Sequence, residues 1–265
     1  MGKIIAIANQ KGGVGKTTTT VNLGACLADM GFRVLIVDLD PQGNTTSGFG
    51  LNKDTLLNTS YEVLLGDVTA KEAICSLDSY KLKLLPASLD LSGAEVELIG
   101  IDNRESLLQN ALEPERGNYD FIFIDCPPSL NILTINAFKA ADSILVPIQC
   151  EFYAMEGLTQ LINTINLVKQ RLNPVIEIEG ILFTMFDSRT NLCTEVVNEI
   201  TRYLPDKVYQ TKIPRNIRLA EAPSYGMPVI YYDRTSKGSE SYRQLAEEVV
   251  KRCGLKAPET FKDQD

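Results

Sequence analysis

The 265-residue chain contains no histidine. This absence excludes a histidine general base, a Ser-His-Asp triad and any metal site with imidazole ligands, so catalysis would depend on carboxylate and lysine side chains. No two cysteines are spaced as in a C-x-x-C motif; they stand at Cys26, Cys75, Cys126, Cys150, Cys193 and Cys253. This scatter argues against a zinc site and a disulfide framework, and it favours a reducing cytoplasm.

Other features are also missing. Met1-Gly2-Lys3 leads directly into a short apolar run, so we expect neither a secretory signal nor a membrane span. The 26 basic and 34 acidic residues give a net charge of −8, which excludes a general attraction to nucleic acid. No linker, repeat or low-complexity segment interrupts the chain before its last dozen residues. We therefore expect one domain over residues 1–254 and a polar, flexible tail over residues 255–265.

A glycine-rich turn follows the first apolar run. It reads Lys11-Gly12-Gly13-Val14-Gly15-Lys16-Thr17, and a helix is predicted to begin near its end. Backbone N–H groups and the helix dipole converge on an anion at such a turn, and glycine avoids a collision between a Cβ atom and a phosphate. We expect Lys11 to Thr18 to hold the phosphates of a nucleotide, with Lys16 on the β- and γ-phosphates and Thr17 on Mg²⁺. Gln10 replaces the usual first glycine, and Lys11 is one lysine more than phosphate binding needs.

Two further apolar runs end in carboxylates. Val34–Val37 precedes Asp38 and Asp40, and Phe121–Ile124 precedes Asp125. Continuous apolar runs are typical of strands that are covered on both faces, and ligands bind beyond the carboxyl ends of parallel strands. We expect Asp125 to hold the Mg²⁺ ion, either directly or through another ligand of the ion, and Asp38 to help through water. We expect Asp40 to orient or deprotonate an attacking water. At any one of these positions, capping of the next turn is the alternative role.

Four segments of the chain resemble the ParA/Soj group of DNA-segregation ATPases, which carries the deviant Walker A motif. They are Lys11–Thr17, Asp38–Gly43, Ile124–Ser129 and Ile213–Ser224, with the sequences KGGVGKT, DLDPQG, IDCPPS and IPRNIRLAEAPS. The resemblance extends from Lys3 to about Arg252. The first segment alone would indicate only the wider superfamily, which also contains division-site regulators, nitrogenase iron proteins and arsenite pump ATPases.

The resemblance implies a chromosome-partitioning ATPase with ATP and Mg²⁺ as cofactors. In this family the lysine that matches Lys11 reaches across an ATP-sandwich homodimer to the nucleotide of the partner subunit. The residues that match Pro214 and Asn216 contact the adenine. The residue that matches Asp40 supports hydrolysis together with Lys16. No residue stands out as a fast catalytic base, so we expect slow turnover that a partner stimulates. The resemblance implies that this partner is a ParB/Spo0J-like centromere-binding protein with a basic N-terminal segment. The ATP-bound dimer would bind double-stranded DNA without sequence preference and would associate with the nucleoid.

Apolar runs alternate with helical patterns along the chain. Strands are predicted at residues 3–8, 33–37, 82–86, 120–124, 143–147 and 179–184, with helices at residues 16–29 and 156–172 among others. This alternation predicts an α/β fold with a doubly wound, mostly parallel sheet that is flanked by helices. Because the first strand begins at Lys3, we expect the compact form of the family, without an upstream helix-turn-helix domain.

The last predicted helix, Ser239–Cys253, is amphipathic. One interpretation is a membrane-binding helix, and the other is a helix that packs on the sheet. Its polar face carries Glu247 and Glu248 beside Arg243 and Lys251, so it lacks the basic excess of a membrane-binding helix. We therefore expect it to face the core.

A local basic segment offsets the acidic net charge. Residues 207–219 contain four basic side chains and no Asp or Glu. Together with the family position at Arg189, this segment predicts that Arg189, Lys212, Arg215 and Arg218 contact DNA phosphates. Such binding would be independent of base sequence and sensitive to salt. The alternatives are an ordinary solvated face and, for Arg215, a contact beside the adenine.

Two other functions remain open at this stage. The first is a metallocluster or ATP-dependent biosynthetic enzyme on the same scaffold, although Cys126 has no evident mate for a bridging cluster. The second is a membrane-cycling regulator of cell division, against which the polar tail argues. Glu151, which follows the fifth predicted strand, is interpreted either as a dimer-interface residue or as a carboxylate at a helix start.

Overall fold

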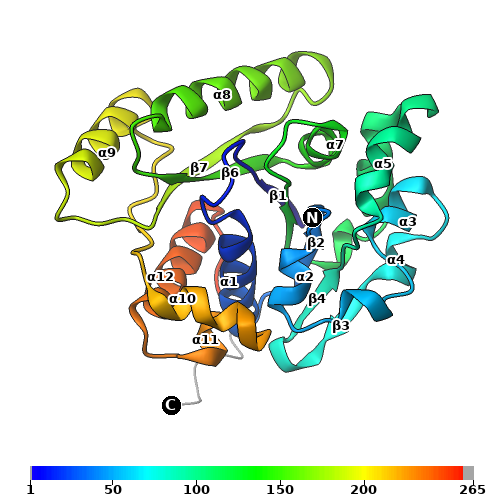
Figure 1. The fold of residues 1–265 in the computed structure, drawn as a ribbon, viewed down its shortest axis with the longest axis horizontal. Helices are drawn as coiled ribbons and strands as arrows, with labels where there is room; N and C mark the ends of the chain where they lie inside the picture. Colours follow the sequence, from blue (N-terminus) through cyan, green and yellow to red (C-terminus); the bar gives the residue numbers. More distant parts are fainter. Residues whose placement is uncertain (1, 259–265) are drawn as a thin grey trace.

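A seven-stranded sheet lies at the centre of the computed structural model, which describes residues 2–258 except for the side chain of Glu95. The strand order is β3-β4-β2-β5-β1-β6-β7, with β1 close to the middle (Figure 1). The strands are β1 (Lys3–Ile7), β2 (Val34–Asp38), β3 (Cys75–Leu77), β4 (Leu82–Leu85), β5 (Phe121–Asp125), β6 (Ser143–Gln149) and β7 (Glu177–Thr184).

Every strand pair in this sheet is parallel except β3 with β4. All residues of β2 and β5 are buried, because helices cover both faces of the sheet. The predicted mostly parallel, doubly wound α/β fold is therefore confirmed. The strand β3 was not predicted, since it has only three residues, of which Leu77 alone is buried.

Helices connect the strands and form a layer on each face of the sheet. In Figure 1, α1 and α12 lie on one face while α7 and α8 lie on the other. The helices are α1 (Lys16–Asp29), α2 (Asn44–Gly48), α3 (Ser60–Leu65), α4 (Ala70–Ala73), α5 (Leu91–Glu97), α6 (Leu107–Leu112), α7 (Ile132–Ala140), α8 (Ala154–Arg171), α9 (Asn191–Tyr203), α10 (Ile217–Glu221), α11 (Val229–Tyr232) and α12 (Lys237–Arg252).

The last helix packs against the core, as its apolar spacing predicts. Tyr242 on α12 is 1% exposed, and its hydroxyl lies 3.2 Å from the Thr19 hydroxyl on α1. The helix begins two residues before the predicted start because Ser236 caps it by accepting a hydrogen bond from the Ser239 amide. Residues 255–258 of the predicted tail have no regular structure, and residues 259–265 lie outside the described part. Within residues 2–258, no helix is both long enough and apolar enough to span a bilayer.

The helix α1 approaches the sheet closely enough to require a glycine. A Cβ atom at Gly24 would lie 2.6 Å from Cδ1 of Ile36 on β2. Since α1 starts directly after the glycine-rich turn, this contact fixes the position of the turn above the carboxyl ends of β1 and β5. The predicted start and end of α1, Lys16 and Asp29, are both confirmed.

Candidate nucleotide site

The turn between β1 and α1 leaves open space where an anion would lie. Gly13 and Gly15 have φ angles of +75° and +88°, which glycine adopts without strain. A Cβ atom on Gly12 or Gly13 would meet no other atom within 4 Å, so packing does not require glycine at either position, whereas the positive φ of Gly13 favours it there. Gly15 caps α1 without a side-chain hydrogen bond, so the first N–H groups of α1 remain available to a ligand.

Lys16 lies inside this turn and is 7% exposed. Its ammonium donates a hydrogen bond of 3.2 Å to the carbonyl oxygen of Lys11. Burial lowers the pKa of Lys16, and the charges of Asp125 and Asp40 oppose that change. A bound phosphate would add a further negative charge beside the ammonium and would favour its charged form.

Lys11 has a different environment, on the outside of the turn. Its ammonium pairs with the Glu151 carboxylate, and the two side chains are 50% and 47% exposed. Glu151 stands three residues before α8, so its carboxylate joins the loop after β6 to the glycine-rich turn. Lys11 therefore does not line the cleft around Lys16, and its half-exposed side chain pairs with Glu151 outside that cleft.

Two carboxylates lie side by side at the carboxyl edge of the sheet. Asp38 and Asp125 are register partners at the ends of β2 and β5, and both are fully buried. Asp125 accepts hydrogen bonds from the hydroxyls of Thr17 (2.7 Å), Thr45 (2.8 Å) and Thr20 (3.3 Å). The Thr17 bond joins two of the residues that the sequence predicts as Mg²⁺ ligands.

The second carboxylate is held by the short helix α2. Asp38 accepts bonds from the amide (2.8 Å) and the hydroxyl (2.7 Å) of Thr46. Burial raises the pKa of both Asp38 and Asp125, and the charge of Asp125 raises that of Asp38 further. A divalent cation at this edge would oppose both changes, because a nearby positive charge favours ionised carboxylates.

The donor set suits Mg²⁺ rather than a softer metal. It consists of hydroxyl and carboxylate oxygens, and Mg²⁺ is usually held by one or two carboxylates together with water and substrate phosphates. No group of three or more His, Cys, Asp or Glu side chains that could cage a metal occurs within residues 2–258. A magnesium ion here would therefore depend on the nucleotide for part of its coordination.

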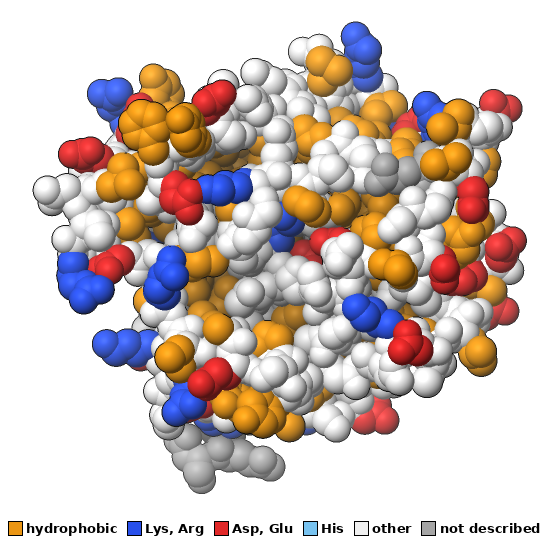
Figure 2. All heavy atoms as spheres, in the orientation of Figure 1, with side chains coloured by type: hydrophobic (Ala, Val, Ile, Leu, Met, Phe, Trp, Pro, Cys, Tyr) orange, Lys and Arg blue, Asp and Glu red, His pale blue; other side chains and the backbone are white. Residues whose placement is uncertain are grey.

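A cleft of about 330 Å³ is lined by most of the predicted phosphate-binding residues, but not by Lys11 or Val14. Lys16, Thr17 and Asp40 all line it. Asp40 is 7% exposed, and its Oδ1 accepts a 3.0 Å hydrogen bond from the Gln42 amide. Figure 2 shows both basic and acidic side chains below the surrounding surface near the centre of this face.

A second cavity, of about 190 Å³, adjoins this cleft. The two share Gly15, Thr18 and Met185, and the second is lined mainly by apolar groups that include Pro214. Asn216 also lines it, while its Oδ1 caps α10 by accepting bonds from the amides of residues 218 and 219. The two predicted adenine contacts thus lie beside the phosphate cleft, in a cavity whose apolar walls suit a flat base.

Several residues of the site were missed by the sequence analysis. The Thr184 hydroxyl at the end of β7 donates a 2.7 Å bond to the Val14 carbonyl and so anchors the glycine-rich turn. Met185 follows with a φ of +48°, which is rare for a residue other than glycine. Thr45 and Thr46 were also missed, because a hydroxyl after a strand-end Asp gives no signal without knowledge of the pairing of β2 with β5.

The predicted DNA contacts fall into two groups. The first lies where residues 185–189 run beside residues 213–215, joined by the Phe186 amide and the Ile213 carbonyl. Here Lys212 lies over the Phe186 ring at 4.7 Å, and the charge of Arg215 acts on Asp187. Figure 2 shows Lys and Arg side chains spread over this side of the molecule, near α9 and α10.

Acidic neighbours compensate part of this basic surface. Arg189 pairs with Asp187 at 2.6 Å, which lowers the pKa of that carboxyl to about 2. The second group is Arg218 on α10, which pairs with Glu221 at 2.8 Å and Asp233 at 3.1 Å. The four charges counted in the linear segment are therefore not four free cations, because the fold brings in carboxylates from outside it.

Comparison with known proteins places this site in a family. Residues 2–178 match the family described as AAA domain. The sporulation initiation inhibitor protein Soj of Bacillus subtilis is 56% identical over 250 residues, covering 94% of this chain and 99% of that protein. The chromosome partitioning protein ParA of Myxococcus xanthus is 54% identical over 258 residues, covering 97% and 91%.

The fold also matches solved structures. One is cobyrinic acid a,c-diamide synthase from Mycobacterium smegmatis with bound ADP and magnesium, with a TM-score of 0.81, 39% identity and coverage of 97% of this chain and 98% of that one. Soj and ParA are more similar in sequence to this chain than the diamide synthase is, and they match nearly the whole chain. The chain therefore belongs to the ParA/Soj family.

Proposed function

We propose that this protein is a DNA-segregation ATPase whose ATP-bound homodimer holds DNA without sequence preference. The observation that carries the proposal is the single cleft in which Lys16, Thr17 and Asp40 meet below the glycine-rich turn. Identity of more than half with Soj and ParA over nearly the full length supports the same role. Residues 1–254 would act as one ATPase domain, since β1, α1 and α12 contribute to a common core.

ATP and Mg²⁺ are the cofactors that this cleft suits. The phosphates would lie on the N–H groups at the start of α1 with Lys16, and the base would occupy the cavity beside Pro214 and Asn216. The Thr17 hydroxyl would coordinate Mg²⁺ while Asp125 positions the ion. A solved neighbour that contains ADP and magnesium supports this assignment.

Asp40 is the proposed hydrolysis residue. Its carboxylate lies in the cleft, where it would orient the water that attacks the terminal phosphate. Lys11 would reach the nucleotide of a second subunit, because its own side chain lies outside the cleft of its subunit. We expect slow intrinsic hydrolysis, which a ParB/Spo0J-like partner would stimulate, in a cytoplasmic protein that associates with the nucleoid.

DNA binding would come from Arg189, Lys212 and Arg215, with Arg218 on α10. Pairing with Asp187, Glu221 and Asp233 weakens each arginine as a phosphate ligand in a single subunit. In the ATP-bound dimer, two such surfaces would bind the same DNA together, and this multivalency would strengthen the binding. DNA binding would therefore depend on ATP, because ATP is needed to form the dimer.

The test is binding to random duplex DNA with ATP, ADP or no nucleotide, at low and raised salt. We expect salt-sensitive binding with ATP, stronger binding for Asp40→Ala, and its loss for Arg189→Glu. Arg171→Glu, an exposed change at the end of α8, is the matched control and should bind as the wild type does. Absence of DNA binding in every ATP-bound form would refute the proposal.

A biosynthetic ligase is the second candidate, because one structural relative is named a cobyrinic acid diamide synthase. These 265 residues contain no histidine, so they hold no Cys-His couple to release ammonia from glutamine. ATP-dependent amidation of cobyrinic acid with ammonium, followed by mass spectrometry, distinguishes the two. Product formation with no DNA binding would favour the ligase.

A further inference from the structure

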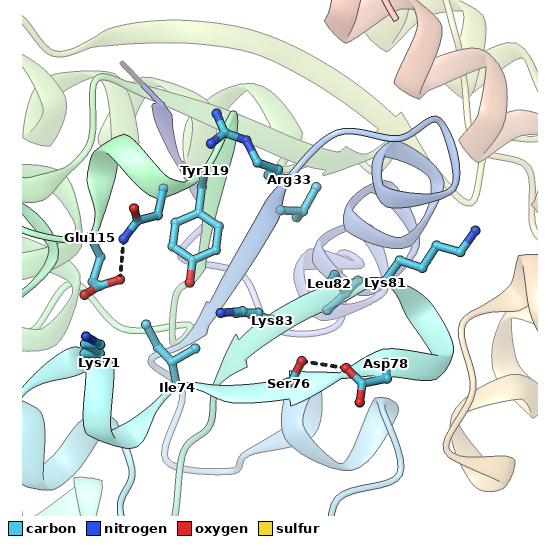
Figure 3. A pocket seen from close by; sticks show the side chains of 12 residues that line it. Arg33, Lys71, Ile74, Ser76, Asp78, Lys81, Leu82, Lys83, Glu115 and Tyr119 are labelled. Carbon is cyan, nitrogen blue, oxygen red and sulfur yellow. Dashed lines mark hydrogen bonds between the residues drawn. The ribbon is translucent and has the colours of Figure 1, made fainter. Parts of the chain in front are cut away.

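A cavity of about 520 Å³ lies away from the nucleotide site, at the opposite edge of the sheet (Figure 3). It opens where β2 and β4 begin and where the chain enters β5, whereas the nucleotide site lies beyond the carboxyl ends of β1, β2 and β5. No residue lines both this cavity and the phosphate cleft. Its volume is within the range of cavities that bind small organic molecules.

The lining of this cavity is basic although the chain is acidic overall. Four cations, Arg33, Lys71, Lys81 and Lys83, face two carboxylates, Asp78 and Glu115. Both carboxylates already accept hydrogen bonds: Asp78 from the Ser76 hydroxyl at 2.7 Å and Glu115 from the Asn118 amide at 3.0 Å. Figure 3 shows these two bonds at opposite sides of the cavity.

Two of the cations lack a compensating partner. Arg33 is neutralised by Asp120 at 2.7 Å. Lys71 on α4 and Lys83 on β4, by contrast, form no ion pair or side-chain hydrogen bond with another described residue. Positive charge in a concave site with apolar walls concentrates the field on a ligand more than the same charge on a flat surface does.

Tyr119 supplies a second, independent feature. The residue as a whole is 5% exposed, and its hydroxyl forms no hydrogen bond with another residue within 2–258. In Figure 3 the hydroxyl points into the cavity toward Lys83 and Ile74. Burial raises the pKa of Tyr119 to about 12, and the charge of Glu115 adds to the effect, so the hydroxyl stays protonated and can donate. A protonated hydroxyl that faces the cavity can donate a hydrogen bond to an oxygen of a ligand.

We propose that this cavity binds a small organic molecule that carries a phosphate group. The ammonium groups of Lys71 and Lys83 would contact the phosphate, and the Tyr119 hydroxyl would donate to one of its oxygens. The apolar side chains of Ile74 and Leu82 would contact the organic part. This site is separate from the ATP site, and its existence does not depend on the DNA-segregation role.

The test uses glucose 6-phosphate as the probe, in calorimetric titrations of the full chain with and without Mg·ADP. We expect saturable binding that persists with Mg·ADP, whereas glucose and citrate bind at least tenfold more weakly. Loss of the signal with Mg·ADP would assign it to the glycine-rich turn and overturn the proposal. Equal binding of glucose or citrate, or no saturable binding of any probe, would also overturn it.

Substitutions test whether Lys71, Lys83 and Tyr119 contact the ligand. The double change Lys71→Gln and Lys83→Gln should weaken glucose 6-phosphate binding at least tenfold, and Tyr119→Phe should weaken it about tenfold. Lys169→Gln, an exposed change on α8, is the control and should bind as the wild type does. If Tyr119→Phe lowers stability, ¹³C-tyrosine spectra of the wild type replace it, and the Tyr119 signal must shift on titration. Unchanged affinity in the lysine variant, or an unmoved Tyr119 signal, refutes the proposal.

Discussion

Replacement of Thr184 by valine is expected to loosen the glycine-rich turn from the sheet. Valine has the same β-branched shape as threonine, so the change removes the hydroxyl without opening a cavity. Thr184 is 2% exposed and donates to the carbonyl of Val14, a residue that is 1% exposed, at 2.7 Å. The variant leaves that carbonyl oxygen without the Thr184 hydroxyl as a donor at a buried position.

The expected cost is about 1–3 kcal/mol in the free energy of unfolding, which is the usual penalty for a buried polar group that loses its partner. For a chain of this size that corresponds to a fall of roughly 2 to 5 °C in Tm. Urea titration followed by circular dichroism measures the free energy, and a fluorescent ATP analogue measures whether the turn still binds nucleotide. We expect weaker nucleotide binding, because the turn is no longer anchored to β7.

Two further variants make this prediction refutable. Thr184→Ser keeps the hydroxyl and should lose less stability than the valine variant. Thr159→Val removes an exposed hydroxyl that bonds within α8, and it should stay within about 0.5 kcal/mol of the wild type. If Thr184→Val is as stable as the wild type, or if Thr159→Val loses as much, the anchoring argument is wrong.

Three other outcomes are expected. Gly180→Ala should cost about 1–3 kcal/mol in urea unfolding, because its Cβ would lie 2.4 Å from the Tyr209 ring; Gly117→Ala, with open space, should cost little. Thr17→Val should weaken nucleotide binding at least tenfold with Mg²⁺ but leave binding in EDTA unchanged, and equal loss in both would contradict the ligand role. Burial raises the pKa of Cys26 to about 12, so thiolate is scarce below that pH and iodoacetamide should label it slowly between pH 7 and 9 until urea is added. Rapid labelling of the folded chain would contradict this.

The elements that were predicted well are those with a long, regular pattern. The helix α1 was predicted from Lys16 to Asp29 because the glycines before it and Gly31 after it define both ends. Apolar runs identified β1, β2 and β5, since strands that are buried on both faces contain few polar residues. The short strand β3 gave no such pattern, and only its pairing with β4 defines it.

Local motifs identified the centre of the site but not its supports. Lys16, Thr17 and Asp40 stand in recognisable segments, and the structure brings them to one cleft. Thr184 lies 170 residues from the carbonyl that it anchors, so no local pattern could reveal the contact. The pairing of Arg218 with Asp233 could not be predicted from a local pattern either, because it depends on the packing of α10 against α11.

The position of β1 in the middle of the sheet has a consequence for folding. It pairs with β5 and β6, which begin more than 100 residues later in the chain. During synthesis the glycine-rich turn therefore emerges early but has no sheet to hold it until residue 125 has left the ribosome. Such distant pairing closes long loops and slows folding. Competence to bind a nucleotide should thus appear late and abruptly, when β5 docks between β1 and β2.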